Sequence, residues 1–242
     1  MVIIVGSGEK SEIKTIKNNI VESPRANVSL TKNASGIVLK RAIDLIASSI
    51  GLISLAPLLL VIAILIRIDS PGPAIFAQRR IGKDGKEFTF YKFRSMYRDC
   101  DESLHQDYMA KLINSSTEDL KGKDGCFKLE DDPRVTRVGR FLRKSSLDEL
   151  PQLINVLRGE MSLVGPRPAL PYEVEIYDPW HMGRLAVIPG ITGLWQVSGR
   201  SEKNFQEMVE LDLKYIDNWS IWLDLKIILK TFQVIFNKQG AW

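Results

Sequence analysis

An aspartate and a glutamate stand side by side at Asp148 and Glu149, in a stretch rich in basic residues. The neighbouring cations are Arg134, Arg137, Arg140, Arg143, Lys144, Arg158 and Arg167. Two carboxylates can hold a magnesium ion together with substrate phosphates, because Mg²⁺ usually takes only one or two protein carboxylates. An aspartate can also attack phosphorus directly and form an aspartyl-phosphate intermediate. The segment therefore indicates chemistry on a phosphate or diphosphate.

Helix capping is an alternative role for both acids. The run Ser146 to Glu149 matches the S-x-x-E capping box, in which Glu149 would only cap a helix. Pro151 argues against Ser146 as the N-cap, since proline would then fall at the fifth helical position, where its missing N–H removes a helical hydrogen bond. With Asp148 as the N-cap, Pro151 lies in the first turn and is tolerated. Capping is the commoner role for such residues, so the local sequence leaves both roles open.

Two rigid turns carry further arginines. Arg167 lies between Pro166 and Pro168, and Arg200 follows Ser198-Gly199. The planar guanidinium suits phosphate oxygens. The alternative is that these arginines, like the run before Asp148, form a solvated surface.

The elements that must position these residues follow from the apolar spacing. Residues 131–165 have two apolar runs at helical spacing, which predict two helices with a joint at Ser145-Ser146. Residues 74–81 and 87–93 flank a turn that contains Asp84-Gly85, and predict a β-hairpin. Helices are predicted at 172–186 and 204–215, and a polar loop or short helix at 97–128.

Residues 45–66 carry no charge and are long enough for a helix of about 33 Å. Pro57 predicts a kink near the middle. Three arrangements compete: a kinked helix that spans the membrane, a helix that breaks and returns to the same face, and a buried core helix. The residues alone favour the spanning helix, and the uniformly apolar character disfavours the core helix.

The rest of the chain adds few constraints. The net charge of +4 suits anionic partners without choosing among them. Two cysteines make no disulfide framework, and two histidines without sequence partners make a histidine-based triad improbable. Residues 219–236 combine tryptophans with an apolar face, which fits either a membrane-interface helix or packing on the domain. Residues 1–37 resemble a stub and linker.

Taken together, the motifs resemble one family, the bacterial sugar transferases that act on polyprenyl phosphate. The matching stretches are Lys40-Arg41-x-x-Asp44, Tyr91 to Met96, Asp132 to Thr136, Ser146 to Gln152, Met161 to Pro168, Pro189 to Gly193 and Val197 to Arg200. They follow the family's order and cover about residues 38–242. The departure is at the amino end, where larger members carry additional membrane helices and a further domain.

The resemblance implies roles for particular residues. Asp148 matches the nucleophile on the β-phosphorus of a UDP-sugar, and both Asp148 and Glu149 match ligands of Mg²⁺. Lys92, Arg94, Arg143, Arg167 and Arg200 match basic positions for the substrate phosphates. Pro57 matches the break in a re-entrant helix, which reverses the preference for a spanning helix.

The expected fold is therefore mainly helical α+β. Its expected parts are the stub at 1–37, a re-entrant membrane helix at 38–68, and a catalytic domain at 69–242 with a β-hairpin and interfacial amphipathic helices. The resemblance implies an enzyme at the cytoplasmic face of the bacterial inner membrane. It would transfer a sugar-1-phosphate from the UDP-sugar to undecaprenyl phosphate and release UMP. A weak resemblance at residues 193–197 suggests galactose or glucose as the sugar.

This reaction would begin the synthesis of exopolysaccharide, capsule or O-antigen. The implied partners are the UDP-sugar, undecaprenyl phosphate and membrane lipid, and a homodimer is left open. Two alternatives compete: a transferase that moves only the sugar and releases UDP, and a basic membrane-surface scaffold. Nucleic acid is not an expected partner, because neither a helix-turn-helix nor an aromatic-rich sheet is evident.

Overall fold

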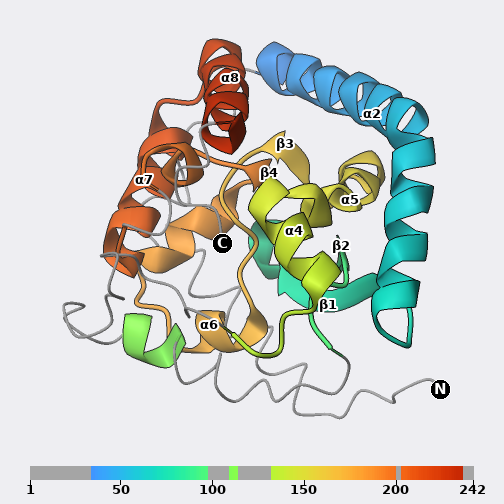
Figure 1. Ribbon diagram of the computed structural model, residues 1–242. Helices are drawn as coiled ribbons and strands as arrows, with labels where there is room; N and C mark the ends of the chain where they lie inside the picture. The colour runs from blue at the N-terminus through green and yellow to red at the C-terminus, as the bar shows by residue number, and fades with distance from the viewer. Residues whose placement is uncertain (1–33, 98–108, 114–131, 200–202, 237–242) are drawn as a thin grey trace.

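The computed structural model describes residues 34–97, 109–113, 132–199 and 203–236 (Figure 1). The predictions for the amino-terminal stub as far as residue 33, for most of 97–128 and for Arg200 lie outside the described residues. The first described element is the long helix α2, Ala34–Asp69, which includes Pro57. Figure 1 shows that α2 bends sharply between its blue and cyan halves, and its hydrogen-bonded helix continues through the bend.

Helix α2 is long and apolar enough to cross a membrane, and only 11% of its most apolar stretch is buried. Thirteen large apolar side chains of this helix are exposed. A helix in the core of a soluble domain would bury these side chains. The core-helix alternative is therefore wrong, and α2 suits a membrane-associated chain.

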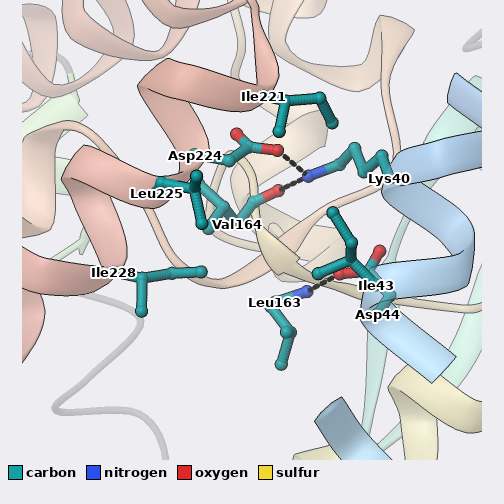
Figure 2. Close-up of a pocket in the computed structure, with 9 residues that line it drawn as sticks. All are labelled: Lys40, Ile43, Asp44, Leu163, Val164, Ile221, Asp224, Leu225 and Ile228. Carbon is teal, nitrogen blue, oxygen red and sulfur yellow. Dashed lines mark hydrogen bonds and ion pairs between the residues drawn. The ribbon is translucent and has the colours of Figure 1, made fainter. Parts of the chain in front are cut away.

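Both halves of α2 contact the same folded body. In the first half, Lys40 Nζ lies 2.6 Å from Asp224 and donates to the carbonyl oxygen of Val164 at 3.0 Å, while Asp44 accepts from the backbone N–H of Leu163 (Figure 2). In the second half, buried Ile62 and Ile66 pack against Phe93 and Leu142. The bend thus brings the two ends of one apolar helix back to one domain.

The predicted hairpin is confirmed. Strand β1, Ile75–Ile81, pairs antiparallel with β2, Glu87–Phe93. Directly opposed residues share a face of the sheet, so Phe76, Gln78 and Arg80 of β1 lie on one face with Lys92, Phe90 and Phe88 of β2.

Two helices with a joint between them follow, as predicted. Helix α4, Arg137–Ser145, begins at Thr136, whose hydroxyl accepts from the N–H of Gly139. A 3-10 turn at Leu147–Glu149 leads into helix α5, Gln152–Arg158. Leu142 is 1% exposed in the cluster with Ile62 and Ile66. The end of α4 is therefore held against the second half of α2.

A small parallel sheet was missed by the sequence predictions, which included 162–164 in the two-helix segment and assigned a turn at 189–193. Strand β3, Ser162–Val164, pairs with β4, Gly190–Thr192. A Cβ atom on Gly190 would lie 2.0 Å from the backbone nitrogen of Gly165, so glycine is needed at this crossing. The predicted helix at 172–186 is confirmed in part, as helix α6, Pro171–Glu175, and a 3-10 segment, His181–Ala186.

The largest core lies between the small sheet and the carboxyl-terminal helices α7, Phe205–Asp217, and α8, Ile221–Phe236. Helix α7 begins at Asn204 with a complete capping box to Glu207, close to its predicted start. Helix α8 carries Asp224, the partner of Lys40, and lies beside the first half of α2 (Figures 1 and 2). The mainly helical α+β class with a β-hairpin is confirmed.

Candidate active site

The backbone around Asp148 is set by the end of α4. Ser146 ends that helix in the left-handed conformation, with φ of 55°, and its side chain forms no capping hydrogen bond. Asp148 lies in the following 3-10 turn, and α5 begins only after Pro151. Ser146 precedes the 3-10 turn without a side-chain capping bond, and the N-cap of α5 is Pro151, so neither the Ser146 nor the Asp148 side chain caps α5 and both capping alternatives are wrong.

Lys92 of the hairpin faces both acids. Its Nζ lies 3.0 Å from Glu149 Oε1 and 3.7 Å from Asp148 Oδ2. The Asp148 side chain is 9% exposed and that of Glu149 is 28% exposed, so one acid is buried and the other reaches solvent. The lysine thus holds a positive charge between two carboxylates of different exposure.

Arg143 adds a second positive charge from the last turn of α4. Its Nε donates to Ser95 Oγ at 2.9 Å, just beyond the end of β2. This bond ties α4 to the hairpin and leaves the rest of the guanidinium for other partners. The positive charge of Arg143 lowers the pKa of Asp148, which places the two groups in one electrostatic site.

Burial nevertheless raises the pKa of the Asp148 carboxyl above its ordinary value. Lys92 opposes this rise, the negative charge of Glu149 adds to it, and Arg143 opposes it. A carboxylate that is poorly solvated and flanked by a second carboxylate gains from an added cation. Such a group is also a stronger nucleophile than a fully hydrated carboxylate.

The predicted phosphate-binding residues are placed differently. Lys92 and Arg143 flank the acid pair, as described above. Arg94 is buried and donates to the carbonyl oxygens of Ser70 and Pro71 at 2.6 Å each. Its guanidinium therefore caps the end of α2 in this conformation, and phosphate binding by Arg94 stays a prediction without geometric support.

Arg167 is half-buried and forms no hydrogen bond or ion pair with the described part of the chain. It lies close enough to Arg80 that its charge lowers the pKa of Arg80. Arg80 is a further basic residue of this region that was not among the predicted site residues. The alternation of the predicted hairpin puts Arg80 on the face that carries Lys92.

The acid pair could bind a divalent cation. Among the residues that the structure describes, no group of three or more His, Cys, Asp and Glu side chains could enclose a metal ion. Mg²⁺ needs no such group, because substrate phosphates and water complete its shell. The Lys92 ammonium already lies between the two carboxylates, so the position favours a cation.

A family model described as "Bacterial sugar transferase" matches residues 35–238 of this sequence. The chain belongs to the bacterial sugar transferases. The match covers α2 and every later described element. The acid pair, Lys92 and Arg143 therefore all lie within the part shared with this family.

Curated relatives agree with this assignment. The chain is 47% identical to galactosyl transferase CpsE of Streptococcus agalactiae over 208 residues, 86% of this chain and 44% of that protein. It is 43% identical over 218 residues to an undecaprenyl-phosphate galactose phosphotransferase of Salmonella typhimurium, 90% of this chain and 44% of that protein.

The exopolysaccharide production protein ExoY of Rhizobium meliloti is 41% identical over 207 residues, 86% of this chain and 89% of that protein. The chain spans 44% of the length of CpsE and of the Salmonella relative, and most of ExoY.

Proposed function

We propose that this bacterial sugar transferase moves a sugar-1-phosphate from a UDP-sugar to undecaprenyl phosphate and releases UMP. One observation carries the proposal: the buried Asp148 carboxylate lies beside Glu149, with Lys92 Nζ 3.7 Å away and the positive charge of Arg143 near enough to act on it. This arrangement can attack a phosphorus atom and neutralise the charge that develops on the phosphoryl oxygens. The printed names of the relatives agree, since one is an undecaprenyl-phosphate galactose phosphotransferase.

In the first half-reaction, an Asp148 oxygen attacks the β-phosphorus of the donor. A bond forms between this oxygen and phosphorus, and the bond from phosphorus to the oxygen that bridges the two phosphates breaks. UMP leaves with the bonding electrons, and the sugar phosphate remains attached to Asp148. In the second half-reaction, an oxygen of undecaprenyl phosphate attacks the same phosphorus, and Asp148 leaves as a carboxylate.

Lys92 and Arg143 support both half-reactions by the same means. Each faces the carboxylate and can face the transferred phosphoryl group, whose charge spreads over its oxygens in the transition state. Asp148 and Glu149 would hold Mg²⁺ through their carboxylate oxygens. When bound, Mg²⁺ would act as a Lewis acid on the diphosphate.

We further propose that α2 enters the membrane and returns to the cytoplasmic face. The contacts of both halves with one domain support this arrangement, because a spanning helix would separate its ends by the membrane thickness. Other exposed apolar side chains suit the same lipid surface: Phe141, Ile154, Trp222, Leu229 and Phe232. The active site would then open near the membrane, where the lipid phosphate of the acceptor lies.

The test is nucleotide release by the purified full chain with Mg²⁺, undecaprenyl phosphate and a panel of UDP-sugars. UMP and UDP are assayed separately. We expect UMP with one sugar, galactose or glucose. UDP as the product would show transfer of the sugar alone, and neither nucleotide across the panel would favour a scaffold.

A further inference from the structure

We propose that Arg80 joins Arg167, already implied as a phosphate-binding residue by the family resemblance, and that the two bind the α-phosphate of the nucleotide donor, the phosphate that leaves as part of UMP. This inference rests on the proposed function and adds a subsite to it. The site lies on the hairpin face that carries Lys92, farther along the strands from α2.

Arg80 is a buried cation without a counter-ion. It is 6% exposed, and its guanidinium donates only to Gln78 Oε1 at 3.1 Å and to the carbonyl oxygen of Pro168 at 3.0 Å. No carboxylate in the described ranges forms an ion pair with it, and its Nη2 has no hydrogen-bond partner there. Burial of an unpaired charge is unfavourable, so this arrangement favours an anionic ligand.

The charges around Arg80 also favour an anionic ligand. Burial and then the charge of Arg167 lower the pKa of Arg80 to about 10, and Glu173 opposes the shift. The Glu173 carboxylate itself accepts from the backbone N–H of Leu170. A neutral side chain could supply a donor to Pro168 without this cost, so support of the turn does not explain two adjacent arginines.

Arg167 supplies the second donor group. It is half-buried between two prolines of the turn after β3, and its guanidinium forms no hydrogen bond or ion pair with described residues. Two guanidinium groups that repel each other come together stably when an anion lies between them. Phosphate oxygens accept such forked hydrogen bonds in pairs.

The Phe90 ring connects this pair with the acid site. Arg80 Cζ lies 5.1 Å and Lys92 Nζ 5.6 Å from the centre of that ring. The two charges are therefore within about 11 Å of each other, a separation that one nucleoside diphosphate can bridge. With the β-phosphorus at Asp148, the α-phosphate would extend toward Arg80.

The alternative occupant, the phosphate of the lipid acceptor, fits this position less well. Arg80 lies four residues along β1 from Phe76, the partner of Lys92, which corresponds to about 13 Å of strand. The strand leads away from the end of α2, so the pair is farther than Lys92 from the point where the proposed membrane helix ends. A soluble nucleotide can reach this position more readily than a lipid headgroup.

The experiment measures UMP affinity of the full chain in lipid nanodiscs by calorimetry, for wild type, Arg80→Gln, Arg80→Lys and Arg167→Gln. We expect each glutamine variant to weaken UMP binding about 10- to 100-fold, without a fall in melting temperature. Arg80→Lys keeps the charge and loses the fork, so it should fall between. Arg79→Gln is the matched control, since Arg79 lies on the opposite face and pairs with Glu87 at 2.7 Å.

Unchanged UMP affinity in the folded glutamine variants overturns the proposal, and so does a wild type that binds no UMP. If Arg80→Gln does not fold, the half-buried Arg167→Gln decides the matter. Steady-state KM values separate the two phosphates: a rise for the UDP-sugar alone supports the subsite, and a rise for undecaprenyl phosphate alone contradicts it. UMP release by wild type with an unchanged KM in Arg167→Gln leaves the proposed function standing without this subsite.

Discussion

At the scale of single residues, the candidate site buries the Asp148 carboxylate, which makes its ionised form less stable than it would be in water. Because burial raises the pKa of Asp148, its ionised form is disfavoured in the folded protein. The folded state therefore loses stability as the pH rises through this pKa, and a neutral side chain removes the loss. Functional groups often have such a cost in stability.

We predict that Asp148→Asn abolishes UMP release and the covalent adduct, and stabilises the protein by about 1 kcal/mol at neutral pH. Mass spectrometry of protein incubated with the UDP-sugar detects the adduct, and thermal unfolding gives the stability. Asp132→Asn is the opposite control. The Arg134 hydrogen bond lowers the pKa of Asp132, so that carboxylate contributes stability that is lost as the pH falls, and its amide should destabilise the fold. Full activity of Asp148→Asn would exclude it as the nucleophile.

A second residue-scale prediction concerns pH dependence. The nucleophile must be ionised, so activity should rise with pH through the pKa of Asp148. Lys92 lowers that pKa, and Lys92→Gln should therefore move the acid limb of kcat/KM to higher pH. Lys92→Arg keeps the charge and should keep the limb near its wild-type position. A limb that does not move in Lys92→Gln would show that Lys92 does not tune this carboxylate.

At the scale of elements, the left-handed conformation of Ser146 sets the orientation of the acid pair. Ser146 has φ of 55°, a conformation that costs a non-glycine residue about 1–2 kcal/mol. It turns the chain between α4 and the 3-10 turn, so Asp148 points to the hairpin and not along a continued helix. Asp84 in the hairpin turn has a similar φ of 56°, but Ser146 is the strained residue that adjoins the acid pair.

We predict that Ser146→Gly retains activity and stability, because glycine adopts this conformation freely. Ser146→Val should lose about 1–3 kcal/mol of stability and most of its activity, since a β-branched side chain rarely adopts positive φ. Urea unfolding and UMP release measure the two effects. Equal activity of the glycine and valine variants would show that this turn does not align the site.

The sequence predicted those elements whose signals are local. The hairpin followed from alternation around Asp84-Gly85, and α7 from the apolar spacing after Asn204. The parallel pair β3–β4 could not be predicted this way, because Ser162 and Gly190 meet across 28 residues and each strand has only three residues. The capping alternatives at Ser146 and Asp148 were wrong because Ser146 ends α4 in the left-handed conformation and α5 begins only after Pro151.

For the site, the acid pair and Arg143 stood out as one charged cluster in the sequence, and Lys92 was implied by the family resemblance. The hydrogen bonds of Arg94 to the end of α2 could not be predicted, since they depend on where α2 ends. Arg80 was missed because a strand arginine beside Arg79 looks like a surface residue until the register shows which face it takes.

At the scale of the whole molecule, both ends of α2 should lie on the cytoplasmic side. Lys40 joins the first half to Asp224 of α8, and Arg94 holds the second half at Ser70. These polar contacts fix two points of the helix to one domain, and the apolar bend between them has no protein partner over most of its surface. The bend must therefore be covered by lipid to hide its apolar side chains.

We predict that cysteines introduced at Ser35 and Arg67, in a chain with Cys100 and Cys126 replaced by serine, react with a membrane-impermeant maleimide from the cytoplasmic side only. Inside-out and right-side-out vesicles give the comparison. Ile53→Cys, near the bend and 77% exposed in the protein alone, is the matched control and should be protected in both, because lipid rather than protein covers it. Detergent should expose it. Reaction of Ser35→Cys and Arg67→Cys from opposite sides would show that α2 spans the membrane, and the contacts at Lys40 and Arg94 could then not both persist in the bilayer.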